Sequence, residues 1–143
     1  MELRIRNAET KDSEAIANLS GQLGYESTES QIRKRLEILL ASKDHCVLVA
    51  VEDGIVAGWI HAFHSVQVES GFFVEIGGLV IDENHRRKGI GQLLMERVLP
   101  WAKSRGCLKI RVRCNTKRAA SHLFYRSIGF TETKEQKIFD REI

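Results

Sequence analysis

The sequence predicts one α/β domain built on a central mixed, mostly antiparallel sheet with helices on both faces. Amphipathic helical patterns alternate with short apolar runs that are typical of strands. The length of 143 residues suits one domain. The composition, with 43% hydrophobic and 29% charged residues, is ordinary for a globular chain. We therefore expect residues 1–143 to form a single domain.

The apolar periodicity predicts these elements in chain order: a strand at 3–6, a helix from Lys11 to Gly21 or Gly24, a helix from about 28 to 42–44, strands at Cys46–Val51, Ile55–Phe63 and Phe72–Ile81, a helix from Ile90 to Gly106, a strand at Cys107–Cys114, a helix at Lys117–Ile128, and a strand or strand pair at Phe130–Phe139. Thr10 is expected to cap the first helix, and Ser27 or Thr28 the second. Asp53-Gly54 indicates a hairpin turn. Pro100 predicts a kink or a break in its helix.

The strand Phe72–Ile81 leads into a basic, glycine-bearing turn at the start of the next helix. Gly77 and Gly78 favour a bulge in this strand or the close approach of a ligand. The first amides of a helix have no intrahelical partner, and the helix dipole is positive there. Arg86–Gly91 therefore predicts an anion site in which backbone amides are the donors. The alternative is a capped turn that binds nothing.

Two known phosphate motifs do not fit this turn. A P-loop requires Gly-Lys-Ser/Thr after four variable residues, and a Rossmann fingerprint requires a third glycine where Leu94 stands. The pattern that fits is Arg-x-x-Gly-x-Gly, from Arg86 to Gly91. A second block downstream ends in Phe124-Tyr125-x-x-x-Gly129-Phe130. Together the two blocks resemble the acetyl-CoA signature and the final helix of the GNAT superfamily of N-acetyltransferases.

This resemblance covers roughly Leu3–Ile138 in element order, and its specific motifs lie in Val74–Phe130. It implies the GNAT fold, in which one strand pair splays apart and the pantetheine arm of acetyl-CoA fills the gap. It also implies acetyl-CoA as the acetyl donor, without a metal. The implied cofactor-binding residues are Leu79, Val80, Ile81, Arg86, Arg87, Lys88, Gly89, Ile90, Gly91 and Asn115. For Asn115, an Asx turn before the last helix is an equal alternative.

Tyr125 is the candidate general acid. An amine that attacks a thioester expels a thiolate, and a phenol is suited to protonate it. The alternative is a tyrosine at the edge of the core, beside Leu123 and Phe124.

Glu75 is the candidate general base, because it is the one acid in an otherwise apolar strand and burying a carboxylate is costly. Leu79 and Ile81 share its face if the Gly77-Gly78 pair does not change the register. Some histone-acetylating members of the superfamily carry a glutamate at this spacing. The alternative is a glutamate that pairs with a basic residue or faces solvent.

Charge is unevenly distributed along the chain. Residues 85–126 contain twelve Lys or Arg and one acid, a net charge of +11, so the remaining residues carry −8 of the total +3. A basic block suits an anionic cofactor and an acidic remainder suits a cationic amine. A solvated basic face or nucleic-acid contact is the alternative. We expect no nucleic-acid partner, because exposed aromatic residues do not alternate with the basic ones.

The sequence indicates neither membrane insertion nor secretion. No apolar run reaches the roughly 18 residues of a membrane span, and Met1–Arg6 lacks a signal-peptide core, so we expect a cytoplasmic protein. Cys46, Cys107 and Cys114 lie in or beside apolar runs and are expected to be buried free thiols.

The function that these features favour is transfer of an acetyl group from acetyl-CoA to a primary amine of a small molecule or protein, by direct attack. One alternative is a non-catalytic acyl-CoA sensor. Another is an acetylating toxin or modifier directed at RNA or the ribosome, which strong salt-dependent RNA binding would reveal. The sequence does not identify the acceptor amine, and it leaves a homodimer open.

Overall fold

The computed structural model describes residues 2–143. The chain divides into two compact units, one up to Val112 and one over Arg113–Ile143. The single domain expected from the sequence remains a prediction.

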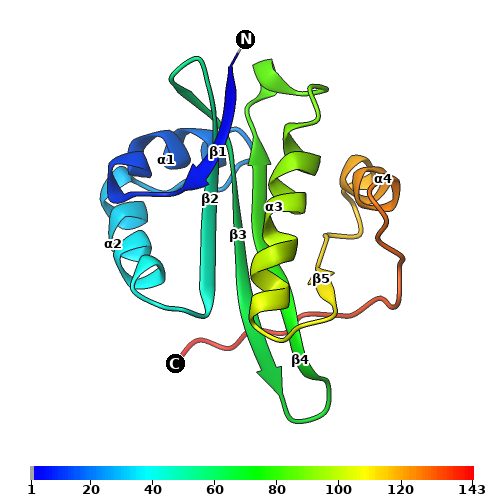
Figure 1. The fold of residues 1–143 in the computed structure, drawn as a ribbon. Coiled ribbons are helices and arrows are strands. Elements are labelled where there is room, and N and C mark those ends of the chain that lie inside the picture. Colours follow the sequence, from blue (N-terminus) through cyan, green and yellow to red (C-terminus); the bar gives the residue numbers. More distant parts are fainter. Residues whose placement is uncertain (1) are drawn as a thin grey trace. The chain divides into compact units, whose positions relative to one another are not determined.

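The first unit contains a five-stranded sheet (Figure 1). Its strands are β1 (Leu3–Asn7), β2 (His45–Glu52), β3 (Ile55–Gln67), β4 (Gly71–Ile81) and β5 (Ile110–Val112), in the spatial order β1-β2-β3-β4-β5. The pairings from β1 to β4 are antiparallel, and β4 pairs with β5 in parallel. This confirms the predicted mixed, mostly antiparallel sheet.

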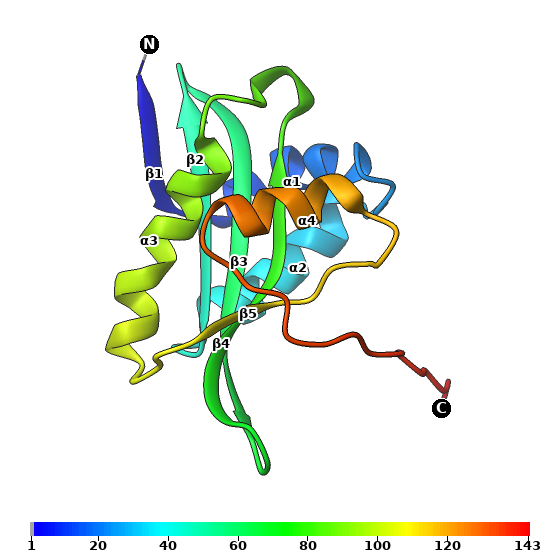
Figure 2. The same ribbon diagram turned by 90° about the vertical axis from the view of Figure 1, so that its right-hand side faces the viewer.

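Helices cover both faces of this sheet, as Figures 1 and 2 show. On one face lie α1 (Ser13–Gly21) and α2 (Glu29–Leu40), and on the other lies α3 (Ile90–Ser104). Short 3-10 turns, η1 (Thr10–Asp12) and η2 (Glu83–His85), precede α1 and α3. Ile16 of α1 and Leu36 of α2 share one buried cluster with Val47 and Val49 of β2. No helix in the described part of the chain is long and apolar enough to cross a bilayer.

Local signals set the helix and hairpin boundaries, with one exception. Thr28 caps α2 in a capping box with Gln31, and Asp53 and Gly54 both have positive φ, at 50° and 81°, as the predicted hairpin requires. The N-cap of α1 is Asp12 rather than Thr10, because η1 intervenes. The helix does not break at Pro100, since α3 continues to Ser104.

The second unit contains α4 (Ala119–Ser127) and an irregular C-terminal segment. The predicted strand at Phe130–Phe139 is wrong, because residues 130–143 form no strand. Alternating apolar residues favour an extended backbone, but a strand also needs a neighbour for its amides and carbonyls. Within the second unit no other strand offers that edge, and Ile138 and Phe139 remain exposed.

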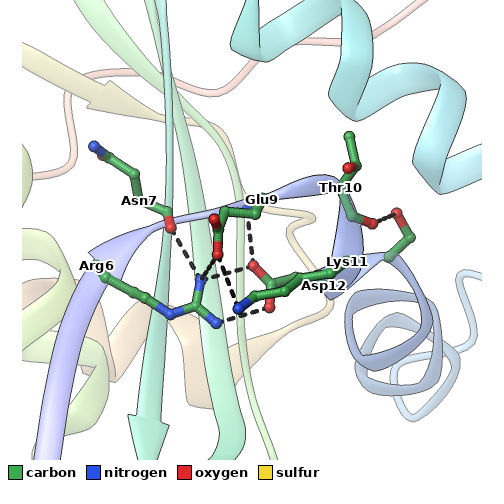
Figure 3. Close-up of polar contacts among 7 residues, drawn as sticks. Arg6, Asn7, Glu9, Thr10, Lys11 and Asp12 are labelled. Atoms are coloured by element: carbon green, nitrogen blue, oxygen red, sulfur yellow. Dashed lines mark hydrogen bonds and ion pairs between the residues drawn. The ribbon is translucent and has the colours of Figure 1, made fainter.

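An ion pair between β1 and η1 anchors the start of α1 (Figure 3). Arg6 donates from both terminal nitrogens to Asp12, at 2.8 and 2.9 Å, and the Glu9 amide donates to the same carboxylate at 2.8 Å. The Asp12 side chain is only 4% exposed. Burial raises the pKa of Asp12, but the bonds from Arg6 and Glu9 outweigh it and hold the pKa below 3.8. Ionised Asp12 therefore stabilises the fold.

Replacing Asp12 by Asn should lower the free energy of unfolding by roughly 1–3 kcal/mol at neutral pH, because Arg6 loses a charged partner. Since the folded-state pKa lies below the unfolded one, this contribution is present above pH 3.8 and is lost as pH falls through the folded-state pKa. Urea denaturation at several pH values measures it. Exposed Glu37→Gln is the matched control. A difference between wild type and Asp12→Asn that persists undiminished under strongly acidic conditions would contradict this assignment.

Candidate functional site

The turn between β4 and α3 presents free backbone amides. Arg87 and Gly89 have positive φ, at 66° and 76°, which turns the chain sharply into the helix. The first intrahelical bond of α3 runs from the Leu93 amide to the Gly89 carbonyl, at 3.0 Å. Within residues 2–143, the amides of residues 87–92 donate no hydrogen bond. This arrangement can hold an anion, as the sequence predicts.

A buried carboxylate at the end of β2 contacts two side chains of this turn. Glu52 is 3% exposed, and both of its oxygens lie 3.3 Å from Nζ of Lys88. One of them also lies 3.4 Å from Nε2 of His85. Lys88 was predicted to attract the anion, but its charge is paired with Glu52. Glu52 was not among the predicted site residues. The only sign of it in the sequence is that an acid directly follows a buried apolar run.

The end of α1 is tied to the same turn. Gln22 donates to Oδ1 of Asp82 at 2.8 Å and accepts from the Glu83 amide at 3.0 Å. His85 contacts the second oxygen of Asp82 at 2.6 Å. The bonds from Gln22 and then His85 lower the pKa of Asp82 below its usual value. These contacts hold the approach to α3 in one conformation.

Beyond this turn, β4 has one unpaired edge. Its parallel pairing with β5 covers Val74, Glu75 and Ile76 only. On its other side, β3 pairs with it as far as Ile81. Residues 77–81 therefore have no strand neighbour on the β5 side within the first unit. The backbone of Leu79, Val80 and Ile81 is available at this edge for an extended ligand.

The glycine pair in β4 forms the predicted bulge, but side chains of β3 occupy the space above it. His61 pairs with Gly78 and Ala62 with Ile76, so Gly77 is the extra residue. A Cβ on Gly77 would lie 2.8 Å from Nδ1 of His61, and one on Gly78 would lie 2.6 Å from the Trp59 ring. The glycines are required by these two rings. The close approach of a ligand to this strand, the other possibility, stays a prediction.

The bulge also changes which residues share a face with Glu75. Glu75 lies opposite Phe63, and Val80 lies opposite Trp59, two alternations further along β3. Val80 is therefore on the Glu75 face, and the condition under which Leu79 and Ile81 would share that face is not met. Glu75 itself is half-buried and also faces Arg111 in the β4–β5 register.

In the second unit, Tyr125 is positioned by the C-terminus of α4. The Phe130 amide donates to the Tyr125 carbonyl at 3.0 Å and the Gly129 amide to that of Arg126 at 3.3 Å, with Gly129 at φ 99°. This is a Schellman motif, and it explains the Phe-Tyr-x-x-x-Gly-Phe ending. It places the Phe130 ring against Tyr125, with centroids 5.5 Å apart.

The phenol of Tyr125 is a very weak acid in these surroundings. Burial, followed by the neighbouring Cys114, raises the pKa of Tyr125 to about 12, although Arg118 opposes the shift. The phenol therefore keeps its proton throughout the neutral pH range. A proton donor is thus present on α4.

Asn115 adopts the structural alternative considered for it. Its Oδ1 accepts from the Lys117 amide at 2.9 Å, which is an Asx turn before α4. Its carbonyl accepts from the Arg118 amide at 3.0 Å and faces Nε2 of His122 at 2.9 Å. These contacts order the start of α4.

The cysteines are free thiols, as predicted. Cys107 is buried, whereas Cys46 and Cys114 are half-buried. Burial raises the pKa of Cys46 to about 11 and also raises that of Cys114. Neither thiol is a thiolate at neutral pH, so neither has the character of a nucleophile.

Comparison with known proteins agrees with this geometry. Glucosamine 6-phosphate N-acetyltransferase 1 of Oryza sativa subsp. japonica is 34% identical over 143 residues, covering 93% of this chain and 84% of the relative. Aminoglycoside N(6')-acetyltransferase type 1 of Acinetobacter haemolyticus is 29% identical over 105 residues, covering 73% and 69%. A solved structure of AAC(6')-Iy with a bisubstrate CoA analogue has the same fold, with a TM-score of 0.89, 19% identity and full coverage of both chains.

The family comparison spans most of the chain. The model of the acetyltransferase (GNAT) family matches residues 11–130, which include the basic turn, β4 and the whole of α4. The chain therefore belongs to the GNAT family of acetyltransferases.

Proposed function

We propose that this protein transfers the acetyl group of acetyl-CoA to a primary amine of a small molecule by direct attack, without an acyl-enzyme. The observation that carries the proposal is the set of free amides at the start of α3, next to the unpaired edge of β4. One relative is named for glucosamine 6-phosphate and another for aminoglycosides, so both names specify amino sugars. An amino sugar is the acceptor class that we propose.

The donor is proposed to lie along one continuous surface of the first unit. Its pyrophosphate accepts from the amides between Arg87 and Gly91, and Arg86 and Arg87, both exposed, add positive charge. Its pantetheine arm follows the unpaired backbone of Leu79, Val80 and Ile81 as an added strand would. Lys88 acts differently, because its pairing with Glu52 holds the turn rather than the phosphates.

Two side chains are proposed to move protons. Tyr125 protonates the departing thiolate, which its protonated phenol supports. Glu75 accepts a proton from the incoming ammonium through a water molecule. For Asn115 we propose a supporting role, since its side chain already holds the Asx turn before α4.

We propose that the two units form one acetyltransferase domain that works in the cytoplasm, without a nucleic-acid or membrane partner.

Acetyl transfer itself is tested with an amine panel that contains glucosamine 6-phosphate, aminoglycosides and a lysine peptide. Release of CoA thiol with an amino sugar, faster than background hydrolysis, is the expected result. Thioester hydrolysis that no amine accelerates would contradict the proposal and favour an acyl-CoA-binding protein.

Gly89→Val should weaken CoA binding tenfold or more, about 1.4 kcal/mol, because a β-branched residue is strained at positive φ and displaces the amides. Gly106→Val is the matched control. Gly106 has φ 77° at the other end of α3, and a Cβ on either glycine meets nothing within 4 Å. Titration calorimetry of both folded variants measures the difference. Equal CoA affinities for the two would remove the anion site from the proposal.

Tyr125→Phe should lower turnover on the order of ten- to a thousandfold while CoA affinity stays close to that of the wild type, because the hydroxyl acts in the transition state. Steady-state kinetics and calorimetry together measure this. Tyr25→Phe makes the same chemical change at an exposed position and serves as the control. Lost affinity with preserved turnover would show that Tyr125 is a packing residue.

Glu75→Gln should lower the maximal rate with the true acceptor, because the amide keeps the size of the side chain but accepts no proton. Glu69→Gln, at an exposed position in the β3–β4 turn, is the control. The rate of each variant is measured across pH. A Glu75→Gln protein that keeps the wild-type rate and pH profile would reduce Glu75 to a structural residue.

A further inference from the structure

Two histidines on neighbouring strands form a hydrogen-bonded pair outside the residues discussed so far. His45 is the first residue of β2, and His61 lies in β3. Nδ1 of His45 and Nε2 of His61 are 2.9 Å apart, and the two rings are stacked with centroids at 5.2 Å. Each ring packs against Phe63, at 5.7 Å. Both side chains are half-buried, so the pair is built into the sheet surface.

The other nitrogen of His61 lies against β4 at the bulge. A Cβ on Gly77 would lie 2.8 Å from Nδ1 of His61, so only glycine lets the ring reach this position. Within residues 2–143, Nδ1 makes no hydrogen bond. His61 therefore has one ring nitrogen that faces Gly77 at the bulge and another that is hydrogen-bonded to His45.

The bulge is where the reacting end of the donor is expected. If the pyrophosphate lies at Arg87–Gly91 and the arm runs along Ile81 to Leu79, the next residues that it meets are Gly78 and Gly77. The face of the sheet that carries His61 also carries Glu75, whose register partner Phe63 contacts the His61 ring. Two groups that accept protons therefore lie on the same face near the thioester.

Acetylation of an ammonium requires two protons to leave the nitrogen. The first leaves when the ammonium becomes the amine that attacks. The second leaves after the C–N bond forms, as the C–S bond breaks and the thiolate takes a proton from Tyr125. Glu75 accounts for one of the two. The other either returns to the Tyr125 phenolate or leaves the site by a separate route.

Resting on the function proposed above, we infer that His61 takes the second proton at Nδ1 while its Nε2 proton passes to Nδ1 of His45, which releases its own Nε2 proton to water. The two rings then form a proton relay from the bulge to solvent. One proton enters and one leaves, and both rings end neutral in the opposite tautomer. Between turnovers solvent restores the starting tautomers, returns a proton to the Tyr125 phenolate and takes the proton from Glu75.

The surroundings of His61 favour a relay over a simple base. Burial, followed by the neighbouring His45, lowers the pKa of His61 to about 4, so the ring is neutral at pH 7. A lone imidazolium at this position is costly, and handing the Nε2 proton to His45 avoids it. Besides His45 on β2, the charged group that β4 contributes to this face is Glu75, across from Phe63.

His61→Gln and His45→Phe test the relay. His61→Gln should lower kcat a hundredfold or more with unchanged CoA affinity, as expected for a lost proton acceptor. His45→Phe keeps an aromatic ring stacked on His61 but removes the group that accepts the Nε2 proton of His61. It should lower kcat about tenfold and make the dependence of rate on the D₂O fraction less curved than in the wild type, because fewer protons then move in the same step. Added imidazole should restore part of the turnover of His61→Ala.

His64→Gln is the matched control, because His64 is also half-buried in β3 but pairs with Val74 on the opposite face. It should keep wild-type turnover and curvature. The relay is wrong if His61→Gln keeps at least half of the wild-type kcat, or if His45→Phe keeps the curvature. A wild type that binds CoA but acetylates no amine in the panel would instead overturn the proposed function, and the relay with it.

Discussion

The buried charge of Glu52 is the interaction on which the arrangement of the turn before α3 depends. An almost fully buried carboxylate is stable only with partners that offset its lost hydration, and here Lys88 and His85 supply them. Both partners belong to the turn that leads into α3. Any movement of the turn would unpair or expose the Glu52 carboxylate, and this would cost free energy. The turn backbone is therefore held in place. Its amides, which donate no hydrogen bond within residues 2–143, are held in place before any anion arrives, and this reduces the ordering cost of binding.

A second constraint acts on the strand that precedes this turn. β4 pairs with β3 along its length, but β5 accompanies it only as far as Ile76. The α3 crossover brings β5 back in parallel, and the short pairing leaves the edge of β4 open next to the turn. One strand thus contributes to the core, to the extended edge and to the turn before α3. The bulge at Gly77 determines which side chains of β4 share a face with Glu75.

Local chemistry explains what the sequence predicted well. Thr28 with Gln31, Asp53 with Gly54, and the Arg-x-x-Gly-x-Gly turn each depend on residues a few positions apart, so their signals survive without tertiary information. The Gly129-Phe130 ending is equally local, although its Schellman geometry was not recognised. The family assignment rests on such local blocks, and the comparisons confirm it.

Features that depend on distant neighbours were missed. Glu52 and Lys88 are 36 positions apart and His45 and His61 are 16 apart, and the register that joins each pair cannot be read from either segment alone. The prediction of a strand at Phe130–Phe139 was wrong for a related reason. Alternating apolar residues do not by themselves provide a neighbouring strand with which to pair. The roles of Leu79 to Ile81, Asn115, Tyr125 and Glu75 remain predictions, because their contacts show position and not turnover.

The most direct test of this account follows the backbone amides themselves. Two-dimensional ¹H–¹⁵N spectra of the labelled protein should be recorded during titration with CoA, dephospho-CoA and pantetheine. The account predicts that CoA and dephospho-CoA shift the amide signals of residues 87–92 strongly. Pantetheine, which lacks the pyrophosphate, should affect β4 near Leu79 to Ile81 but leave the turn unchanged. Equal shifts of the turn amides by pantetheine and CoA, or no shift of these amides by CoA at saturation, would contradict it.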